Sequence, residues 1–178
     1  MEKEYNFQVA LRWILRMENN DADWASRLID YDDWRISDRI FKAVTDKWGT
    51  PSIDMFANDR NAKCNVYFSR YQCPGTSGTD AFAHSQPWKD GLLWLVPPVN
   101  LISKTIKWAR SNKSVGILGC PMWDSQPYFP MLKPYGLQWA SFIKDGVLWP
   151  TGTKLFKDPS LPGAFGSQFT RSPLVFSS

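Results

Sequence analysis

Three short apolar runs, each bounded by proline or glycine, constrain the fold of this chain more than any other feature. They are "SIDMF" (52–56), "LLWLV" (92–96) and "VGILG" (115–119). Between the last two runs, the apolar residues of 99–112 recur at the spacing of an amphipathic helix. Strands that are apolar at nearly every position are typical of parallel sheets, which are buried on both faces. We therefore predict an α/β fold, in which these runs are neighbours in one mostly parallel sheet with flanking helices.

The rest of the chain divides around this sheet. Residues 5–17 place Val9, Trp13, Ile14 and Met17 on one helical face, and Asp21 can cap a short second helix. A further helix starts at Ser37 and stops at Gly49. "VYFS" (66–69) is expected to be a strand and "CPGTSGTDA" (73–81) a loop. We predict a helical segment over 1–32, an α/β domain over 33–150, and a poorly ordered tail over 151–178.

Several classes of protein are disfavoured. No apolar run approaches the ~18 residues that span a membrane, and the amino terminus lacks the core of a signal peptide. The three cysteines form no Cys-x-x-Cys pair, and His84 is the single histidine, so a Cys/His zinc site is not expected. We expect an intracellular protein, cytoplasmic or nuclear, with reduced thiols.

Candidate site residues cluster where predicted strands end, because ligands of open α/β sheets lie beyond the carboxyl ends of the strands. Asp54, Asp80, the pair Pro97-Pro98 and "CPMW" (120–123) all fall at such ends. Two alternatives stay open: Asp54 can be a turn or cap residue, and Asp80 can serve ordinary loop geometry. His84 is expected at the surface rather than as a base.

These residues occur in an order that resembles phage-type DNA adenine methyltransferases. The resemblance covers roughly residues 33–133 and is closer to the methyltransferase-like region of DIRS-type retroelements, through "GTPSIDMFA", "DAF" and "PPVNLI". It implies a Rossmann-like fold and S-adenosylmethionine as cofactor, with Asp54 and Asp80 as cofactor-binding residues. The residues that follow the family order are Trp34, Asp54, Ala57, Asn61, Ala62, Lys63, Asp80, Trp88, Pro97 and Pro98.

The leading segment resembles the end of a ribonuclease H domain, the domain that follows a retroelement reverse transcriptase. The similarity lies in "ENNDADWASR", at Asn19, Ala22, Asp23, Ser26 and Arg27. In a full domain the Asp at this place holds a divalent metal with three other carboxylates that precede it. A lone carboxylate is a poor Mg²⁺ site, so Asp23 is expected to bind no metal here. The alternative is a capped helix start.

The catalytic turn of the resembled family is altered in this chain. In Asn-Pro-Pro-Tyr the Asn and a proline carbonyl accept from the adenine amine, and the aromatic ring stacks on the flipped base. Here those positions are Val96 and Val99, so Pro97 and Pro98 are a remnant of the catalytic motif. Asn100 would reach the cleft only if the turn were re-registered. The lack of glycine in "DMFAND" also argues against a retained cofactor pocket.

Charge indicates a possible partner. Residues 51–178 carry thirteen basic and seven acidic side chains, a balance of +6, whereas residues 1–50 balance to −2. Lys104, Lys107, Arg110 and Lys113 follow one another at three-residue spacing on or just after the predicted helix, which suggests sequence-independent contact with DNA or RNA phosphates. Trp94, Trp108 and Trp123 are expected in the core, with stacking on bases as the alternative. A solvated basic face is the alternative for the lysines.

Two functional hypotheses result. The first is a catalytically silent module of a retroelement polyprotein that binds nucleic acid or serves as a scaffold beside the other parts of that polyprotein. The second is an active DNA adenine methyltransferase with a divergent catalytic turn. A decayed fragment without activity is a third interpretation.

Overall fold

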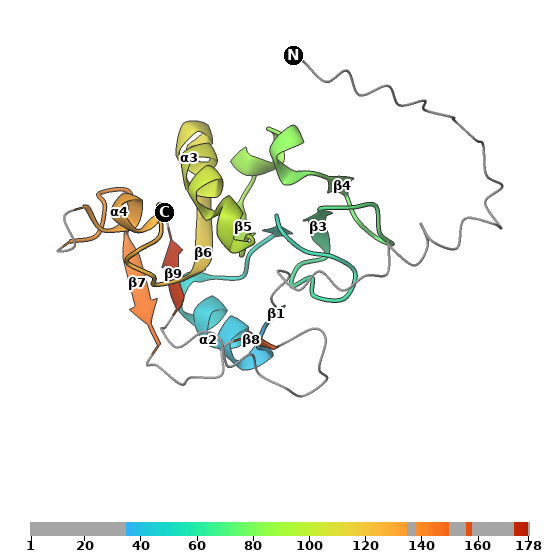
Figure 1. Ribbon diagram of the computed structural model, residues 1–178. Coiled ribbons are helices and arrows are strands. Elements are labelled where there is room, and N and C mark those ends of the chain that lie inside the picture. Colours follow the sequence, from blue (N-terminus) through green and yellow to red (C-terminus); the bar gives the residue numbers. More distant parts are fainter. Residues whose placement is uncertain (1–34, 135–137, 150–155, 158–172, 178) are drawn as a thin grey trace, which may run out of the picture.

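The computed structural model describes residues 35–134, 138–149, 156–157 and 173–177. Its main feature is a twisted sheet with helices on both faces (Figure 1). The helices are α2 (Asp38–Trp48), α3 (Ile102–Asn112) and α4 (Phe129–Leu132), with 3₁₀ turns at Ala81–Ala83, Pro87–Lys89 and Val99–Leu101. The strands are β1 (Arg35–Ile36), β2 (Ile53–Asp54), β3 (Val66–Ser69), β4 (Gly78–Thr79), β5 (Leu92–Leu95), β6 (Val115–Pro121), β7 (Asp145–Leu148), β8 (Phe156–Lys157) and β9 (Pro173–Ser177).

The predicted α/β fold is confirmed. The sheet order is β4-β3-β2-β5-β6-β9-β7, and the first five strands are all parallel. The three apolar runs become the neighbours β2, β5 and β6, with Ile53 beside Leu93 and Trp94 beside Ile117. Chain order runs outward from β2 to β4 on one side and from β5 to β6 on the other, so the order reverses between β2 and β5. This order matches the first five strands of a Rossmann-like sheet, and such reversal points are where these sheets hold ligands.

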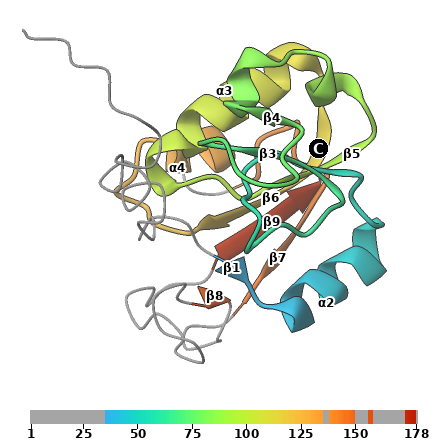
Figure 2. The ribbon, with the colours of Figure 1, turned by 90° about the vertical axis from the view of Figure 1, so that its right-hand side faces the viewer.

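The alternation of β5 separates two apolar cores. Leu93 and Leu95 face the core under α3, whereas Trp94 faces the core over α2. The α3-side core also contains Ile102, Ile106 and Leu118, and the α2-side core contains Ile36, Ile40, Val44 and Ile117. The two views show α2 on one side of the sheet and α3 on the other (Figures 1 and 2). The predicted helix 99–112 is confirmed, with its first three residues as a 3₁₀ turn.

Helix α2 follows Ser37 and ends at Gly49, as predicted. Gly49 has φ +94°, a conformation that glycine adopts without the strain a Cβ would cause. At the end of the helix, the Trp48 indole N–H donates to the Asp145 carboxylate at 2.9 Å, and Lys47 pairs with the same group at 2.7 Å. These contacts tie α2 to β7.

Two stretches within the predicted tail, residues 151–178, form strands. Phe156–Lys157 form β8 beside β1, and Pro173–Ser177 form β9, which lies antiparallel between β6 and β7. The reason is that a neighbouring strand supplies the hydrogen-bonding partners that five residues cannot supply alone. In the same way Gly78–Thr79, expected in a loop, pair with Phe68 and Ser69 as β4.

The predicted helices over residues 5–17 and 22–29 lie outside the described residues, as do Asp23 and Trp34. Within the part of the chain that the structure describes, no helix is long and apolar enough to cross a membrane.

Candidate functional site

Parallel strands bring most of the candidate residues to one edge of the sheet. This carboxyl edge comprises Asp54–Ala57 after β2, Asp80–Ala83 after β4, and Val96–Val99 after β5. β2 and β4 are separated by β3, so Asp54 and Asp80 lie about 10 Å apart across the strands alone. The two carboxylates therefore share an edge but cannot bind the same atom of a ligand.

Asp54 is buried, at 2% exposure, and its carboxylate is engaged with the chain itself. One oxygen accepts the backbone N–H of Phe56 at 3.2 Å and the other that of Lys63 at 3.1 Å. These bonds hold both ends of the connection between β2 and β3, which is the role of a turn or cap residue. The same charge acts on Cys64, whose thiol donates to the Pro51 carbonyl at 3.5 Å. Burial, with a smaller contribution from Asp54, raises the pKa of Cys64 to about 12.

Asp80 repeats this geometry at the end of β4. Its carboxylate accepts the backbone N–H of Phe82 at 3.1 Å, and its φ of +54° turns the chain into the 3₁₀ turn that follows. The side chain is exposed, in contrast to Asp54. Next to it, the His84 ring nitrogen Nε2 lies 3.0 Å from the Thr79 carbonyl oxygen, and the ring packs on Phe68. His84 is half-buried in this edge contact rather than fully at the surface.

Asp54 and Asp80 each accept the backbone N–H of a phenylalanine two residues later, and the side chains of these two phenylalanines are in contact. The rings of Phe56 and Phe82 are 5.6 Å apart between centroids, and Phe82 stacks on Trp88 at 5.7 Å. Trp88 is fully buried and donates its indole N–H to the Ala81 carbonyl at 2.7 Å. Sequence reasoning missed this aromatic cluster, although a signal for it exists: Asp-x-Phe-Ala occurs twice, as "DMFA" (54–57) and "DAFA" (80–83). An Asp that accepts from the amide two residues on is a common turn.

The Pro97-Pro98 turn stands at the reversal point, between β5 and α3. The Pro98 carbonyl accepts the Leu101 N–H at 2.9 Å, so this proline starts the 3₁₀ turn ahead of α3. Val96 packs into the α2-side core, and Val99 packs against the α3-side core. Val96 and Val99 therefore have packing roles on opposite faces of the sheet.

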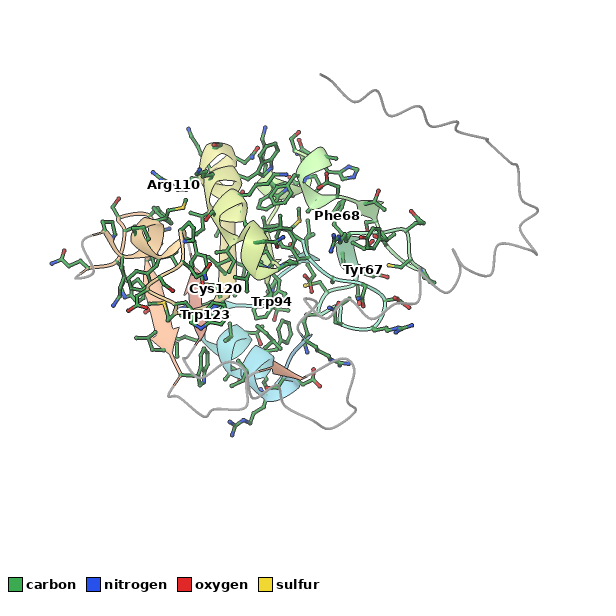
Figure 3. The ribbon with its side chains drawn as sticks, in the orientation of Figure 1. Tyr67, Phe68, Trp94, Arg110, Cys120 and Trp123 are labelled. Carbon is green, nitrogen blue, oxygen red and sulfur yellow. The ribbon has the colours of Figure 1, made fainter. Side chains whose placement is uncertain are left out.

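The three basic residues of α3 and Lys113 just after it are all exposed, but they do not share one face. The Lys104 ammonium lies 3.9 Å from the centre of the Phe82 ring, toward β4, whereas the Arg110 guanidinium lies 4.7 Å from the centre of the Phe142 ring, toward β7. Three-residue steps fall short of a full helical turn of 3.6 residues, so successive side chains drift around the helix. Lys113 follows α3 with φ +54° and caps its end. Figure 3 shows Arg110 on the outward side of α3.

The three tryptophans expected in the core, with base stacking as the alternative, differ in burial. Trp94 is 1% exposed and meets Phe41 edge-on at 4.9 Å, between the sheet and α2 (Figure 3). Trp108 is half-buried and meets Phe82 edge-on at 5.8 Å. Trp123 is also half-buried. The expected core position is confirmed for Trp94.

The end of β6 is closed by an aromatic side chain. The buried Tyr128 hydroxyl donates to the Pro121 carbonyl at 2.8 Å, and burial raises the pKa of Tyr128. Cys120, from the predicted "CPMW" end, is buried as well. Across the described ranges, no group of three or more His, Cys, Asp or Glu side chains is arranged to hold a metal ion.

At the carboxyl edge, the aspartates thus accept hydrogen bonds from the backbone of their own turns, and aromatic side chains pack together. No model of a protein family and no curated protein matches the chain.

Proposed function

We propose that this chain is a methyltransferase-like module of a retroelement polyprotein that transfers no methyl group and instead binds nucleic acid without sequence preference. The observation that carries the proposal is the Pro97-Pro98 turn. It stands at the reversal point of a Rossmann-like sheet, but Val96 and Val99 are packed into the two cores and offer no acceptor or ring to a flipped adenine.

The cofactor-binding assignment is weakened at the same edge. Asp54 and Asp80 each accept a backbone amide of their own turn, and Phe56, Phe82 and Trp88 pack together between them. If S-adenosylmethionine bound here, Asp54 and Asp80 would hold it and it would supply the methyl group. The exposed Asp80 side chain has the access that such a role requires, whereas Asp54 is buried and already accepts two backbone N–H groups.

Nucleic-acid binding is proposed for the exposed side of α3. Lys104 and Lys107 lie one turn apart near its amino end, and both are exposed. Contacts of this kind release counterions from the nucleic acid, so affinity falls steeply with salt and depends little on sequence.

The test is binding of labelled single- and double-stranded DNA across a salt titration. The variant Lys104→Glu/Lys107→Glu is expected to bind more weakly, and the slope of log affinity against log salt is expected to fall by about two for duplex DNA. The matched control is Arg39→Glu/Lys42→Glu, which makes the same charge change on exposed residues of α2, across the sheet. Equal loss in both variants would mean that net charge alone drives binding, and the proposed role of α3 would be wrong.

An active adenine methyltransferase is the second candidate. It is favoured by the common edge that Asp54, Asp80 and Pro97-Pro98 share in a Rossmann-like strand order. Incubation of the chain with radiolabelled S-adenosylmethionine and adenine-containing DNA distinguishes the two. We expect no transfer of label; transfer that is lost in Pro97→Ala/Pro98→Ala would establish the second candidate.

A further inference from the structure

A hollow on the α3 side of the sheet lies away from the carboxyl edge. Its volume is about 360 Å³, within the range of small-molecule sites. The floor is formed by Leu95, Gly116 and Leu118 of β5 and β6, and Ile106 and Ala109 of α3 form one wall. Because Val115 begins β6 and Lys113 follows α3, the hollow lies near the amino end of β6, at the opposite end from Pro121.

The opposite wall comes from a part of the chain that is distant in sequence. Leu132 of α4 and the pair Phe142 and Ile143, just before β7, form this wall. The lining is mostly apolar, with Thr105 of α3 and Ser114 before β6 as its neutral polar members, and its walls belong to separate elements that only the tertiary fold brings together. A mostly apolar hollow of this size favours a ligand with an apolar body, because binding removes the apolar lining from water.

The rim of the hollow is basic. Arg110, Lys113 and Lys144 line it with exposed side chains, and the Arg110 guanidinium lies over the Phe142 ring. Among the described lining residues there is no acidic side chain. The nearest acid in sequence, Asp145, is bound by Lys47 and Trp48 of α2.

We infer that this hollow binds a small molecule with an apolar body and one anionic head group, such as a medium-chain carboxylate. The apolar body fills the space between α3 and Phe142, and the head group meets Arg110 and Lys144 at the rim. A guanidinium binds a carboxylate with paired, charge-assisted hydrogen bonds, which neutral head groups cannot match. Lys104 and Lys107 do not line the hollow, so the inference does not depend on their contact with nucleic acid; Arg110 and Lys113, the other two basic residues of that prediction, belong to the rim.

The test uses the full chain and the fluorescent dye 8-anilinonaphthalene-1-sulfonate, which has an aromatic body and a sulfonate. We expect saturable dye binding, and displacement by decanoate at a concentration about tenfold lower than by decan-1-ol. In Arg110→Ala/Lys144→Ala this preference is expected to disappear while decan-1-ol competes as before. Lys104→Ala/Lys107→Ala is the matched control and should retain the full preference.

A second variant blocks the space itself. Ala109→Phe fills the hollow from α3 and is expected to abolish binding of both competitors while leaving DNA binding unchanged, with folding checked by circular dichroism. Equal displacement by decanoate and decan-1-ol in the parent, or no saturable dye binding, would overturn the inference. Concentration-dependent dimerisation that excludes the dye would also overturn it, because the hollow would then be a contact between two copies.

Discussion

At the scale of single residues, the Asp54 carboxylate is best explained by the amides that it accepts. Asp54→Ala would leave the Phe56 and Lys63 N–H groups without this acceptor. Each of these two part-buried amides costs at most roughly 1–3 kcal/mol when it loses its partner, so the free energy of unfolding should fall by at most about 2–6 kcal/mol. Urea denaturation measures this loss.

The control for this change is Asp54→Asn, which keeps one acceptor oxygen and the size of the side chain. We expect it to lose less stability than Asp54→Ala. If Asp54→Ala were as stable as the parent, the carboxylate would not be needed by its own turn, and a ligand role would gain support.

The Cys64 thiol provides a second prediction at this scale. Its pKa is raised to about 12 by burial and by Asp54, so the reactive thiolate is scarce at neutral pH. We expect iodoacetamide to modify Cys64 much more slowly in the folded chain than in urea, as read by mass spectrometry of its peptide. The rate in Asp54→Asn serves as a check. This change removes the Asp54 charge, which is the smaller of the two causes of the raised thiol pKa, so Cys64 should react modestly faster. Equal rates in the folded and unfolded chain would contradict the prediction.

At the scale of elements, Asp145 couples β7 to α2. Hydrogen bonds from Lys47, from Trp48 and from the Gly146 amide lower the pKa of Asp145 to about 2. A carboxylate with a lowered pKa stabilises the fold above the unfolded value of about 3.9 and loses that contribution as the pH falls through the folded value. We therefore expect the thermal midpoint of the parent to fall between about pH 4 and about pH 2 more steeply than that of Asp145→Asn.

The matched control for the acid titration is Asp90→Asn. Asp90 is exposed and accepts from the neutral Gln86 side chain, so this variant should follow the parent. Parallel curves for the parent and Asp145→Asn would mean that the contact between α2 and β7 contributes no acid-sensitive stability.

At the scale of the whole molecule, β9 joins the edge strand β7 to the rest of the sheet. It pairs with β6 on one side and β7 on the other. A chain that ends at Ser172 is expected to lose amide protection in β7 first, because its described ladder partner is gone, while β2 and β5 stay protected. Hydrogen exchange read by mass spectrometry tests this, with a chain that ends at Ser177 as control. Unchanged exchange in β7 would show that β7 is held by side-chain contacts alone.

The candidate site was partly predictable. The sequence located Asp54, Asp80 and Pro97-Pro98 at strand ends, and the parallel sheet brings them to one edge. The directions of the side chains were not predictable in the same way, because they depend on neighbours that are distant in sequence. Val96 faces the α2-side core, and Lys104 and Arg110 lie over rings on two sides of α3.

By itself, the sequence determined the elements with enough apolar residues to show a pattern: α2, β2, β3, β5, α3 and β6, and with them the mostly parallel sheet. A strand that is buried on both faces needs a continuous run of apolar residues, and a helix that packs on the sheet needs an apolar stripe along one side. Only the tertiary structure decided β1, β4, β8 and β9 and the hollow beneath α3. β1, β4 and β8 have only two residues each, too few for a pattern, and all four strands form because another strand supplies their hydrogen-bonding partners. The hollow depends on spacing between separate elements, which no local stretch of sequence contains.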